Sequence, residues 1–554
     1  MDYRSPLDML YHWEETTPDK VYLQQPFGDS WKTWTWKEAA YEVRAMAGVL
    51  AQMKLPPNSH VALISKNCAH WILCDLAIMM AGHVSIPLYP NIAAHTLKQI
   101  LEHSDARLLF VGKLDGWNVM KEGVPEKMNC ISLPFCSHTE YDTWYDLLNE
   151  AQPIREKVQR SKDETGTIIY TSGTTGISKG VVHRFNSFSF TSLHAIPSLG
   201  LTSASRFFSY LPLSHSAERS LVEMCSMYCG GEVFFVESIE RFSQNLAYAK
   251  PTEFLAVHHI WKKFQERILQ KLPQTKLDLL LSIPFVSAWL KMKVKKQLGL
   301  QFARNIFTGA SPTPATLIKW FSALGIHIQE GYGLTENWSY SHITRKEGIR
   351  IGLVGPPLPG VEVKLADDDE IQVKHEALMS GYYKEPQKTF EAFTGDGFLR
   401  TGDSGLIGKD GYLKITGRVK DIFKTSKGNY VAPAPIELKL SANEAFEFVC
   451  VTGSGLPQPM ALVVLSAIGK SQDLQQLTTL LTSLLQELNP TLDPCEKLSK
   501  LVVISDQWSI ENNMLTPTFK IRRKEVEALY APYFLQWLDS DAIVHFHHNG
   551  SSPL

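Results

Sequence analysis

A loop rich in glycine and hydroxyl side chains is the first place in the sequence where chemistry is expected. It has the sequence YTSGTTGISKG, from Tyr170 to Gly180, and combines three glycines with a lysine. Glycine lets backbone N–H groups approach an anion, and hydroxyl and ammonium groups supply further donors, so the loop predicts phosphate binding. It differs from the GxxxxGK loop that ends in Ser or Thr, because Ser178 replaces the second glycine and Gly180 follows Lys179. The phosphate site is therefore expected to be of another kind.

A second motif, QEGYGLTEN from Gln329 to Asn337, follows the segment ALGIHI, which we expect to form a short strand. Tyr332 offers a flat face to a base, and Thr335 offers a hydroxyl to a phosphate. Glu336 offers the hard carboxylate oxygens that Mg²⁺ prefers. Considered alone, the motif is equally compatible with a purely structural turn.

A third motif is LRTGDSG, from Leu399 to Gly405, in which glycines flank Asp403. A carboxylate in such a turn could accept hydrogen bonds from the two vicinal hydroxyls of a ribose. Gly-Asp turns are common in proteins for purely conformational reasons. The function of Asp403 therefore depends on the other motifs.

Composition limits the class of protein. The chain has 554 residues, of which 44% are hydrophobic and 20% charged, as expected for a soluble globular protein of two or more domains. Its formal net charge of −2 provides no global field for nucleic acid. The eight cysteines include no CxxC pair, and Cys225 and Cys229 lack partners at zinc spacing. They are typical of the reduced thiols of a cytoplasmic protein.

The elements that must hold these motifs are those of an α/β fold. HVALIS, HVSIPLYP, ARLLFVG, TIIYT and GEVFFVE are apolar runs separated by helix-length segments such as AHWILCDLAIMMAG, which predicts mostly parallel sheets. Residues 354–375 alternate in hydrophobicity and predict a small antiparallel β-subdomain. Three further strands are expected in FEFVCVTG, MALVVLSAI and LVVISDQW. We place an N-terminal domain at 1–420 and a C-terminal domain at 421–554.

One apolar segment leaves two interpretations open. The N-terminus lacks the apolar core of a signal peptide, and no apolar run reaches membrane-spanning length. The sequence LDLLLSIPFVSAWLKMKVKK, which begins at Leu277, contains an aspartate and a proline and ends in lysines. It could lie in a membrane interface with its lysines on anionic lipid. The alternative is a partly buried helical hairpin with a solvated basic end.

Taken together, the motifs resemble those of the adenylate-forming (ANL) superfamily. YTSGTTGISKG, GYGLTE, RTGD, ITGRVKD and LTPTFKIRR occur in the same order and at similar separations, nearly from end to end of the chain. LPLSHSAER, TSKGNYVAPAPIE and LTPTFKIRR resemble the long-chain fatty acyl-CoA synthetase branch in particular. The resemblance implies a large α/β N-terminal domain of several subdomains, with mostly parallel sheets and a β-subdomain. It also implies a small, mobile α+β C-terminal domain.

The resemblance implies a fatty acid:CoA ligase. Such an enzyme activates a medium- or long-chain fatty acid with ATP to acyl-AMP, releases pyrophosphate, and transfers the acyl group to coenzyme A, with Mg²⁺ as the metal. No nucleic acid partner is expected, while a homodimer and peripheral membrane contact stay open. Adenylation of another carboxylic acid, transfer to an acyl carrier protein, and a non-catalytic nucleotide- or lipid-binding scaffold are the alternatives.

Residue by residue, the resemblance assigns catalysis to Lys520, Thr335, Glu336 and His215. Lys520 would bridge the carboxylate and the α-phosphate, Thr335 would face that phosphate, and His215 would lie by the acyl group. Glu336 would bind Mg²⁺, with Thr171 as a second ligand. Nucleotide and coenzyme A contacts are expected from Thr171, Ser172, Gly173, Thr174, Thr175, Gly176, Lys179, Gly309, Ala310, Ser311, Glu330, Gly331, Tyr332, Gly333, Thr335, Asp403, Arg418, Lys420, Gly428 and Lys520.

The chain departs from the family pattern at three places. Ser178 replaces a usual proline, which removes one backbone constraint from the phosphate loop. His258 and His259 stand where the branch commonly has V-P-R, in a segment that resembles a wall of the acyl tunnel. Asp369 replaces a usual turn glycine. The preferred chain length of the acid is therefore left open.

Overall fold

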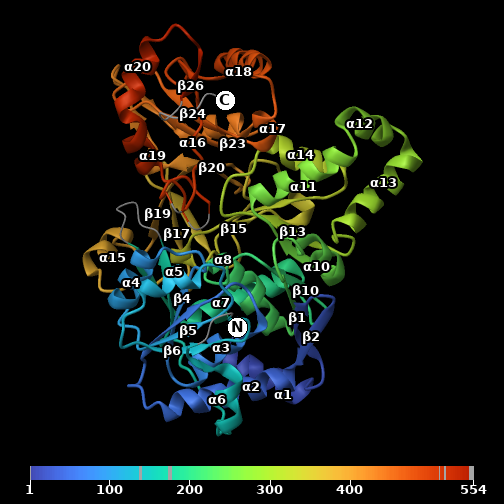
Figure 1. Ribbon diagram of the computed structural model, residues 1–554, viewed down its shortest axis with the longest axis vertical. Coiled ribbons are helices and arrows are strands. Elements are labelled where there is room, and N and C mark those ends of the chain that lie inside the picture. The colour runs from blue at the N-terminus through green and yellow to red at the C-terminus, as the bar shows by residue number, and fades with distance from the viewer. Residues whose placement is uncertain (1, 137–139, 172–177, 511, 517–518, 548–554) are drawn as a thin grey trace.

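The computed structural model describes residues 2–136, 140–171, 178–510, 512–516 and 519–547. Two eight-stranded sheets, both mostly parallel, form the larger part of the molecule and confirm the predicted α/β class (Figure 1). In one sheet the order is β15-β14-β13-β12-β10-β11-β1-β2, and only its two outermost pairs are antiparallel. Its strands are β1 (Val21–Phe27), β2 (Ser30–Thr35), β10 (Arg206–Ser209), β11 (Glu232–Phe235), β12 (Glu253–Leu255), β13 (Asn305–Thr308), β14 (Gln329–Tyr332) and β15 (His342–Ile343).

The second sheet has the order β18-β9-β8-β4-β3-β5-β6-β7 and is parallel from β8 to β7. Alternate residues of β3 enter different cores, since Val61 and Leu63 belong to one buried cluster and Ala62 and Ile64 to another. Both faces of the sheet are thus covered, which is typical of parallel sheets. Its strands are β3 (His60–Ile64), β4 (Val84–Leu88), β5 (Leu108–Val111), β6 (Asn129–Ser132), β7 (Asp142–Thr143), β8 (Thr165–Thr171), β9 (Lys179–Arg184) and β18 (Gly381–Tyr382).

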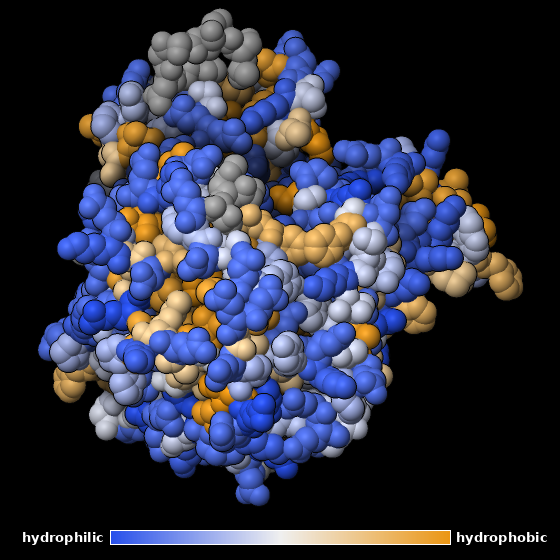
Figure 2. Space-filling view, turned by 60° about the horizontal axis from the view of Figure 1, so that its bottom comes forward, coloured by the Kyte–Doolittle hydropathy of each residue, from blue (hydrophilic) through white to orange (hydrophobic). Residues whose placement is uncertain are grey.

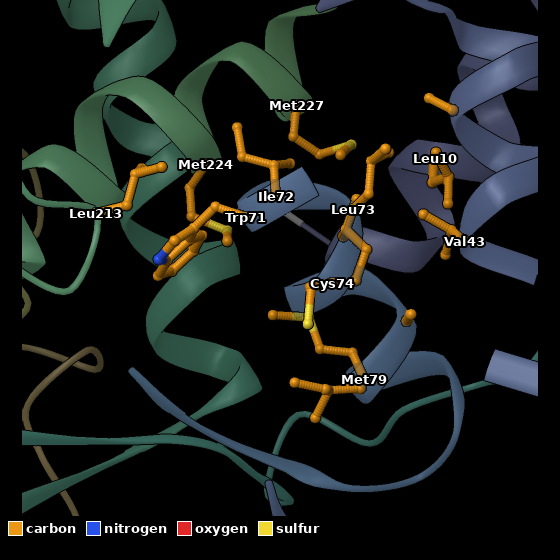
Figure 3. Packing of buried hydrophobic residues seen from close by; sticks show 14 of the residues in the cluster. Leu10, Val43, Trp71, Ile72, Leu73, Cys74, Met79, Leu213, Met224 and Met227 are labelled. Carbon is orange, nitrogen blue, oxygen red and sulfur yellow. The ribbon is translucent and has the colours of Figure 1, made fainter. Parts of the chain in front are cut away.

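Helix α3 lies at the centre of the largest core. Every one of its residues is buried, which explains why its sequence is apolar on all sides rather than on one stripe. Figure 3 shows side chains of this helix packed between those of α1 and α2 on one side and those of the α8–α9 region on the other. The helices that cover the two large sheets and the β-subdomain are α1 (Pro6–Thr16), α2 (Trp36–Gln52), α3 (Ala69–Met80), α4 (Ala94–His103), α5 (Trp117–Met120), α6 (Trp144–Glu150), α7 (Phe185–Leu199), α8 (Ser216–Glu218), α9 (Cys225–Cys229), α10 (Phe242–Ala249), α14 (Ala315–Ala323) and α15 (Pro386–Ala392).

A buried ionic group joins α3 to the segment after α8. Arg219 begins a π-helical stretch, Arg219–Met224, and its side chain is fully buried. Its guanidinium contacts Asp75 of α3 at 2.5 Å and Glu223 at 3.1 Å. Nη1 also donates to the hydroxyl of Thr167 on β8 at 2.7 Å. One cation thus holds together a helix, a strand and the π-helical stretch.

The predicted antiparallel β-subdomain is confirmed as a four-stranded sheet. Its strands are β16 (Glu362–Leu365), β17 (Glu370–Lys374), β19 (Leu399–Ile407) and β20 (Leu413–Arg418), and all pairs are antiparallel. Asp369, which replaces the usual glycine, has φ of 60° in the β16–β17 turn. The left-handed conformation suits glycine and is tolerated by Asp. The substitution therefore leaves the turn intact.

The residues after 420 form a smaller α+β unit, drawn in orange and red in Figure 1. Strands β23 (Phe446–Thr452), β24 (Met460–Leu465) and β25 (Leu501–Ile504) confirm the three predicted strands. Two buried clusters consist only of residues from 423 onward, so this part has its own core. The other elements are β21 (Phe423–Lys424), β22 (Tyr430–Val431), β26 (Val544–His547), α16 (Pro433–Leu440), α17 (Ala467–Lys470), α18 (Leu474–Leu488), α19 (Arg523–Tyr530) and α20 (Phe534–Asp539).

The predicted strand ALGIHI is wrong. Helix α14 continues to Ala323, and the chain then turns at Gly325, where φ is 73°. The strand begins only at Gln329, which pairs with Phe307 of β13. Ile326 is fully buried without lying in a strand, and this burial produced the misleading apolar pattern.

The ambiguous apolar segment forms a helical hairpin. After α11 (His258–Lys271), helices α12 (Gln274–Ser282) and α13 (Pro284–Gln297) extend away from the body, at the right of Figure 1. Within the part of the chain that the structure describes, no helix has both the length and the hydropathy needed to cross a membrane.

Candidate active site

The ends of β13 and β14 bring two of the predicted motifs together. The strands are parallel neighbours, so Gly309 to Ser311 and Gly333 to Glu336 leave the same edge of the sheet, where α/β folds place ligands. The chains approach closely, since a Cβ on Gly309 would lie 3.2 Å from the carbonyl oxygen of Gly331. Ala310 has φ of 66°, a strained value of the kind found at binding sites.

Asp403 links this edge to the β-subdomain. It pairs with Arg418 across β19 and β20, and its Oδ1 lies 2.8 Å from Nε of Arg418. Its Oδ2 accepts a hydrogen bond of 2.7 Å from the hydroxyl of Tyr332 on β14. Burial raises the pKa of Asp403 above its usual value, while Arg418 and Tyr332 oppose the shift. Each carboxylate oxygen keeps a second lone pair with which to accept from a ligand.

Glu336 is held from two sides. Its Oε1 accepts a hydrogen bond of 2.9 Å from the hydroxyl of Tyr382, and its carbonyl accepts from the amide of Met379. The preceding carbonyl, that of Thr335, contacts Nε2 of His183 at 2.7 Å. The loop after β14 is therefore fixed to β9 and β18, and Oε2 of Glu336 has no hydrogen-bond partner among the described residues.

Tyr382 is a site residue that the sequence did not reveal. It lies on β18, which pairs with β9 at the edge of the second sheet. Nζ of Lys179, on β9, lies 4.9 Å from the centre of the Tyr382 ring. Tyr382 thus places the lysine of the phosphate loop close to Glu336. The only available signal was the tyrosine pair in SGYYKEP, which no motif of the chain makes specific.

Lys520 reaches this region from the C-terminal part of the chain. Its backbone closes a turn with Thr516, and Phe519 before it has φ of 58°. Its charge interacts with those of Arg418, Asp403 and Glu336. Desolvation of the ammonium group, followed by the charge of Arg418, lowers the pKa of Lys520 below its usual value. We call Lys179, Glu336, Asp403, Arg418 and Lys520 the charged cluster.

His215 precedes α8, and its ring interacts with the charge of Lys520. Burial, followed by the Lys520 charge, lowers the pKa of His215 to about 4, so its ring is neutral at pH 7. Nδ1 accepts a hydrogen bond of 3.1 Å from the amide of Ala217, which places the ring proton on Nε2. His215 can therefore donate one hydrogen bond without carrying charge.

Glu218, three residues further on, is a buried acid. Its Oε1 accepts hydrogen bonds from the amide of Tyr210 at 3.0 Å and from Asn67 at 3.4 Å. Burial raises the pKa of Glu218 to about 8, so the carboxyl group is mainly protonated at pH 7. His215 and Glu218 are therefore both mainly uncharged at pH 7.

The remaining predicted site residues lie outside the charged cluster or outside the described residues. Thr171 ends β8 and pairs with Lys179, so the two flank the phosphate loop. Oε2 of Glu330 accepts from the amide of Gly352, and burial raises the pKa of Glu330 to about 7. Lys420 is exposed in the turn after β20, and Gly428 lies in the exposed β21–β22 turn. Five predicted residues lie outside the described residues: Ser172, Gly173, Thr174, Thr175 and Gly176.

The donor set fits a nucleotide with its divalent cation. Two carboxylates, two lysines and an arginine come together from three sheets and the C-terminal part of the chain. In the described ranges no group of three or more His, Cys, Asp or Glu side chains could hold a metal ion alone. A single carboxylate such as Glu336 suits Mg²⁺ that keeps waters and shares phosphate oxygens with a nucleotide.

Two family models match the chain. Residues 10–383 match the AMP-binding enzyme family, and residues 420–535 match the AMP-binding enzyme C-terminal domain. The chain belongs to the AMP-binding enzyme family. The first match contains the β13–β14 edge and Tyr382, and the second contains Lys520, so the charged cluster combines residues from both parts of an AMP-binding enzyme.

Curated long-chain-fatty-acid--CoA ligases and a fatty acyl-CoA synthetase resemble the chain along most of its length. It is 28% identical over 579 residues to long-chain-fatty-acid--CoA ligase FadD15 of Mycobacterium bovis, which covers 94% of this chain and 95% of the relative. It is 27% identical over 571 residues to long-chain-fatty-acid--CoA ligase 1 of Homo sapiens, covering 89% and 80%. It is 27% identical over 579 residues to fatty acyl-CoA synthetase A of Dictyostelium discoideum, covering 90% and 86%.

Solved structures share the fold. The anthranilate CoA ligase AuaEII in complex with anthranoyl-AMP has a TM-score of 0.79 and 21% identity, covering 96% of this chain and 98% of that one. ATP-bound MatB from Rhodopseudomonas palustris has a TM-score of 0.76 and 22% identity, covering 95% and 98%. Both therefore share the overall fold of this chain.

Proposed function

We propose that the protein is a fatty acid:CoA ligase that forms AMP. The observation that carries this proposal is the charged cluster, in which Arg418 pairs with Asp403 and the charge of Lys520 interacts with those of Arg418, Asp403 and Glu336. The family and the long-chain fatty acyl-CoA ligases among its relatives support the same reaction. The acid would be a medium- or long-chain fatty acid, and ATP and coenzyme A would be the co-substrates.

The first step makes the carboxylate reactive. A carboxylate oxygen attacks the α-phosphate of ATP, the bond to the β-phosphate breaks, and pyrophosphate leaves with its electron pair. Negative charge builds up on oxygens, so catalysis consists mainly of positioning and of neutralising charge. Lys520 would lie between the carboxylate and the α-phosphate, with Thr335 facing the phosphate. Asp403 would accept from the ribose hydroxyls, and neutral His215 would lie by the acyl group.

Magnesium would be held by Glu336, whose Oε2 has no hydrogen-bond partner among the described residues while Oε1 is fixed by Tyr382. When bound, Mg²⁺ neutralises charge on the phosphates. We propose Thr171 as a second ligand, since it pairs with Lys179 at the base of the phosphate loop. Lys179 would hold the leaving pyrophosphate.

Tyr382→Phe is expected to raise the Mg²⁺ concentration required for half-maximal pyrophosphate release by about tenfold. The change removes the hydroxyl that orients Glu336 but keeps the ring beneath Lys179. Titration of Mg²⁺ at saturating ATP measures the effect. Tyr383→Phe is the matched control, because the hydroxyl of Tyr383 contacts Asp105 instead. Equal shifts in both variants would show that Tyr382 does not act through Glu336.

The second step is transfer of the acyl group to a thiol. Sulfur attacks the acyl carbonyl, the bond to AMP breaks, and the thiol proton is released to solvent. Lys520 would occupy the site of the first step, so we propose that the C-terminal domain, residues 421–554, rotates away between steps. Lys420, exposed in the turn after β20, would be the hinge. The turn that contains Gly428 would then approach coenzyme A.

Lys420→Pro is expected to slow acyl transfer from supplied acyl-AMP to coenzyme A by at least about tenfold, because proline fixes φ at the hinge. Adenylate formation should change much less, because the proposed first step requires no rotation of the C-terminal domain. Lys420→Ala removes the same charge and leaves φ free, so its transfer rate should lie well above that of Lys420→Pro and the difference measures the backbone effect. Unchanged transfer in Lys420→Pro would exclude a hinge at this position.

The function as a whole is tested by pyrophosphate release with palmitate and with benzoate, each with and without coenzyme A. Release with palmitate, and palmitoyl-CoA when coenzyme A is present, is the expected result. Release with benzoate alone would favour another acid, and acyl-AMP without thioester would favour an acyl carrier protein as acceptor. No release with either acid would support the non-catalytic scaffold.

Two further expectations stay predictions. We propose a cytoplasmic location with peripheral membrane contact, which is compatible with a hydrophobic acid as substrate. A homodimer is the other expectation, and sedimentation velocity of the purified chain would measure it directly.

A further inference from the structure

The outer face of the α12–α13 hairpin exposes large apolar side chains. Phe285 is 92% exposed, Met292 is 63% exposed and Trp289 is 52% exposed, all on α13. Ile283 between the helices and Leu279 on α12 extend the exposed apolar surface around the tip. Figure 2 shows this projection at the right, with orange at its end. We call these five residues the apolar tip.

The fold does not require the apolar tip. The buried face of α13 consists of Ser287, Leu290 and Val294. Leu290 and Val294 join the core that includes residues of β12 and β13. Phe285, Trp289 and Met292 follow one another at intervals of four and three residues, so they share the opposite face of the helix. A helix in a globular protein ordinarily exposes polar side chains on that face. The apolar residues are therefore available for contact with another surface.

The same face of α13 becomes basic towards its C-terminal end. Lys293 and Lys296 lie in line with Trp289 and Met292, and both are exposed. Nζ of Lys293 lies 4.5 Å from the centre of the Trp289 ring. Residues 274–297 contain five lysines and one acidic residue, Asp278, which accepts from Gln274. Burial lowers the pKa of Lys295, and the positive charge of Lys346, which follows β15, contributes to this shift.

We propose that this face docks on an anionic lipid bilayer, with the apolar tip at the boundary between headgroups and acyl chains and the lysines on lipid phosphates. Tryptophan and lysine are typical of membrane interfaces. Each side chain has an apolar part that contacts acyl chains and a polar end, an indole N–H or an ammonium group, that stays hydrated. Peripheral binding requires both apolar burial and attraction to anionic lipid, and the hairpin supplies the two along one helix. The proposal concerns docking and goes beyond the ligase reaction.

Co-sedimentation of the full-length protein with vesicles tests the proposal. Binding is expected to vesicles of phosphatidylcholine with 30% phosphatidylglycerol, and should be at least about tenfold weaker to phosphatidylcholine alone. Added salt should weaken it further, because the surface potential is screened. Equal binding to both lipids, or none to either, would overturn the proposal.

Two double variants separate the contributions. The first variant, Phe285→Ser with Trp289→Ser, removes the apolar contact. The second, Lys293→Glu with Lys296→Glu, reverses the charge, and we expect roughly a fivefold loss of vesicle affinity for each lysine. The matched controls are Ile239→Ser, which is 79% exposed elsewhere, and Lys121→Glu with Lys127→Glu. Hairpin variants that bind vesicles as tightly as the controls would contradict the proposal. Circular dichroism and pyrophosphate release with octanoate, free of vesicles, should be unchanged and show that the fold is intact.

A third variant distinguishes lipid contact from self-association. Brominated lipids should quench part of the tryptophan fluorescence, and Trp289→Phe should lose that quenching while it still binds, since phenylalanine keeps the apolar contact. Persistent quenching in Trp289→Phe would place another tryptophan at the bilayer and overturn the assignment. If the Phe285→Ser, Trp289→Ser variant instead turned a dimer into a monomer with vesicle binding unchanged, the face would bind a second copy of the chain.

Discussion

Lys520→Ala is expected to lower the rate of acyl-adenylate formation by about a hundredfold to a thousandfold, the usual effect of removing one group that stabilises developing charge. Among the described residues of the charged cluster, Lys520 is the cation that comes from the C-terminal part of the chain, and its charge interacts with those of Glu336 and Asp403. Without it, the incoming carboxylate and the α-phosphate would repel each other with less compensation. Pyrophosphate release with palmitate measures this step.

Acyl transfer separates a catalytic effect of Lys520 from a structural one. Supplied palmitoyl-AMP and coenzyme A should react at nearly the normal rate in Lys520→Ala, because the lysine serves only the first step. Lys524→Ala is the matched control, since Lys524 is exposed in the adjacent helix α19. Similar losses in both half-reactions would contradict the division of labour proposed for Lys520.

The pH profile follows from the same residue. Displaced water and Arg418 lower the pKa of Lys520, so its charge is lost at a lower pH than that of a free lysine, about 10.5. Adenylate formation requires the charged form, and its rate should fall as pH rises through this pKa. Lys520→Arg keeps its charge over the whole range and should abolish the alkaline decline, even if its maximal rate is lower.

Arg219→Ala is expected to lower the free energy of unfolding by about 3–5 kcal/mol, the cost of removing one partner from a buried ionic group. Asp75 and Glu223 would remain buried without their cation, and the hydroxyl of Thr167 would lose its donor. The guanidinium also lies between aromatic rings, 5.6 Å from the centre of Trp71 and 5.7 Å from that of Trp338. Packing is therefore lost together with charge.

Urea unfolding at several pH values measures the effect of Arg219→Ala. Burial raises the pKa of Glu223 and Arg219 opposes that shift, so without the arginine the pKa should rise further and the folded variant should bind more protons than the unfolded chain. Its unfolding free energy should then fall as pH rises, and the deficit relative to the unmodified protein should be larger at pH 8 than at pH 6. Arg241→Ala, at an exposed ion pair with Asp29, should cost about 0–1 kcal/mol. A similar small cost for Arg219→Ala would refute the structural role.

Local patterns in the sequence were sufficient for the elements but not for all contacts between them. Apolar runs such as HVALIS predicted β3 because a parallel strand is buried on both faces and must be apolar throughout. Ile326 shows the limit of that signal, since a buried loop residue is apolar for the same reason. Tyr382 was missed because its position depends on pairing of β18 with β9, about two hundred residues earlier in the chain. For residues 277–296 the sequence left open an interfacial helix or a partly buried hairpin; the structure shows a hairpin with one buried face of α13, and lipid contact of the other face stays a proposal.

The buried carboxyl groups of the N-terminal domain make the net charge of the folded protein differ from its formal value. The formal net charge of −2 counts every carboxyl group as ionised. Burial raises the pKa of Glu218 to about 8 and that of Glu330 to about 7, so the folded chain retains protons on these two groups at pH 7. Its native charge is accordingly less negative than the formula suggests. Unfolding releases those protons to the buffer, and a calorimetric enthalpy of unfolding will therefore include the ionisation enthalpy of whichever buffer is chosen.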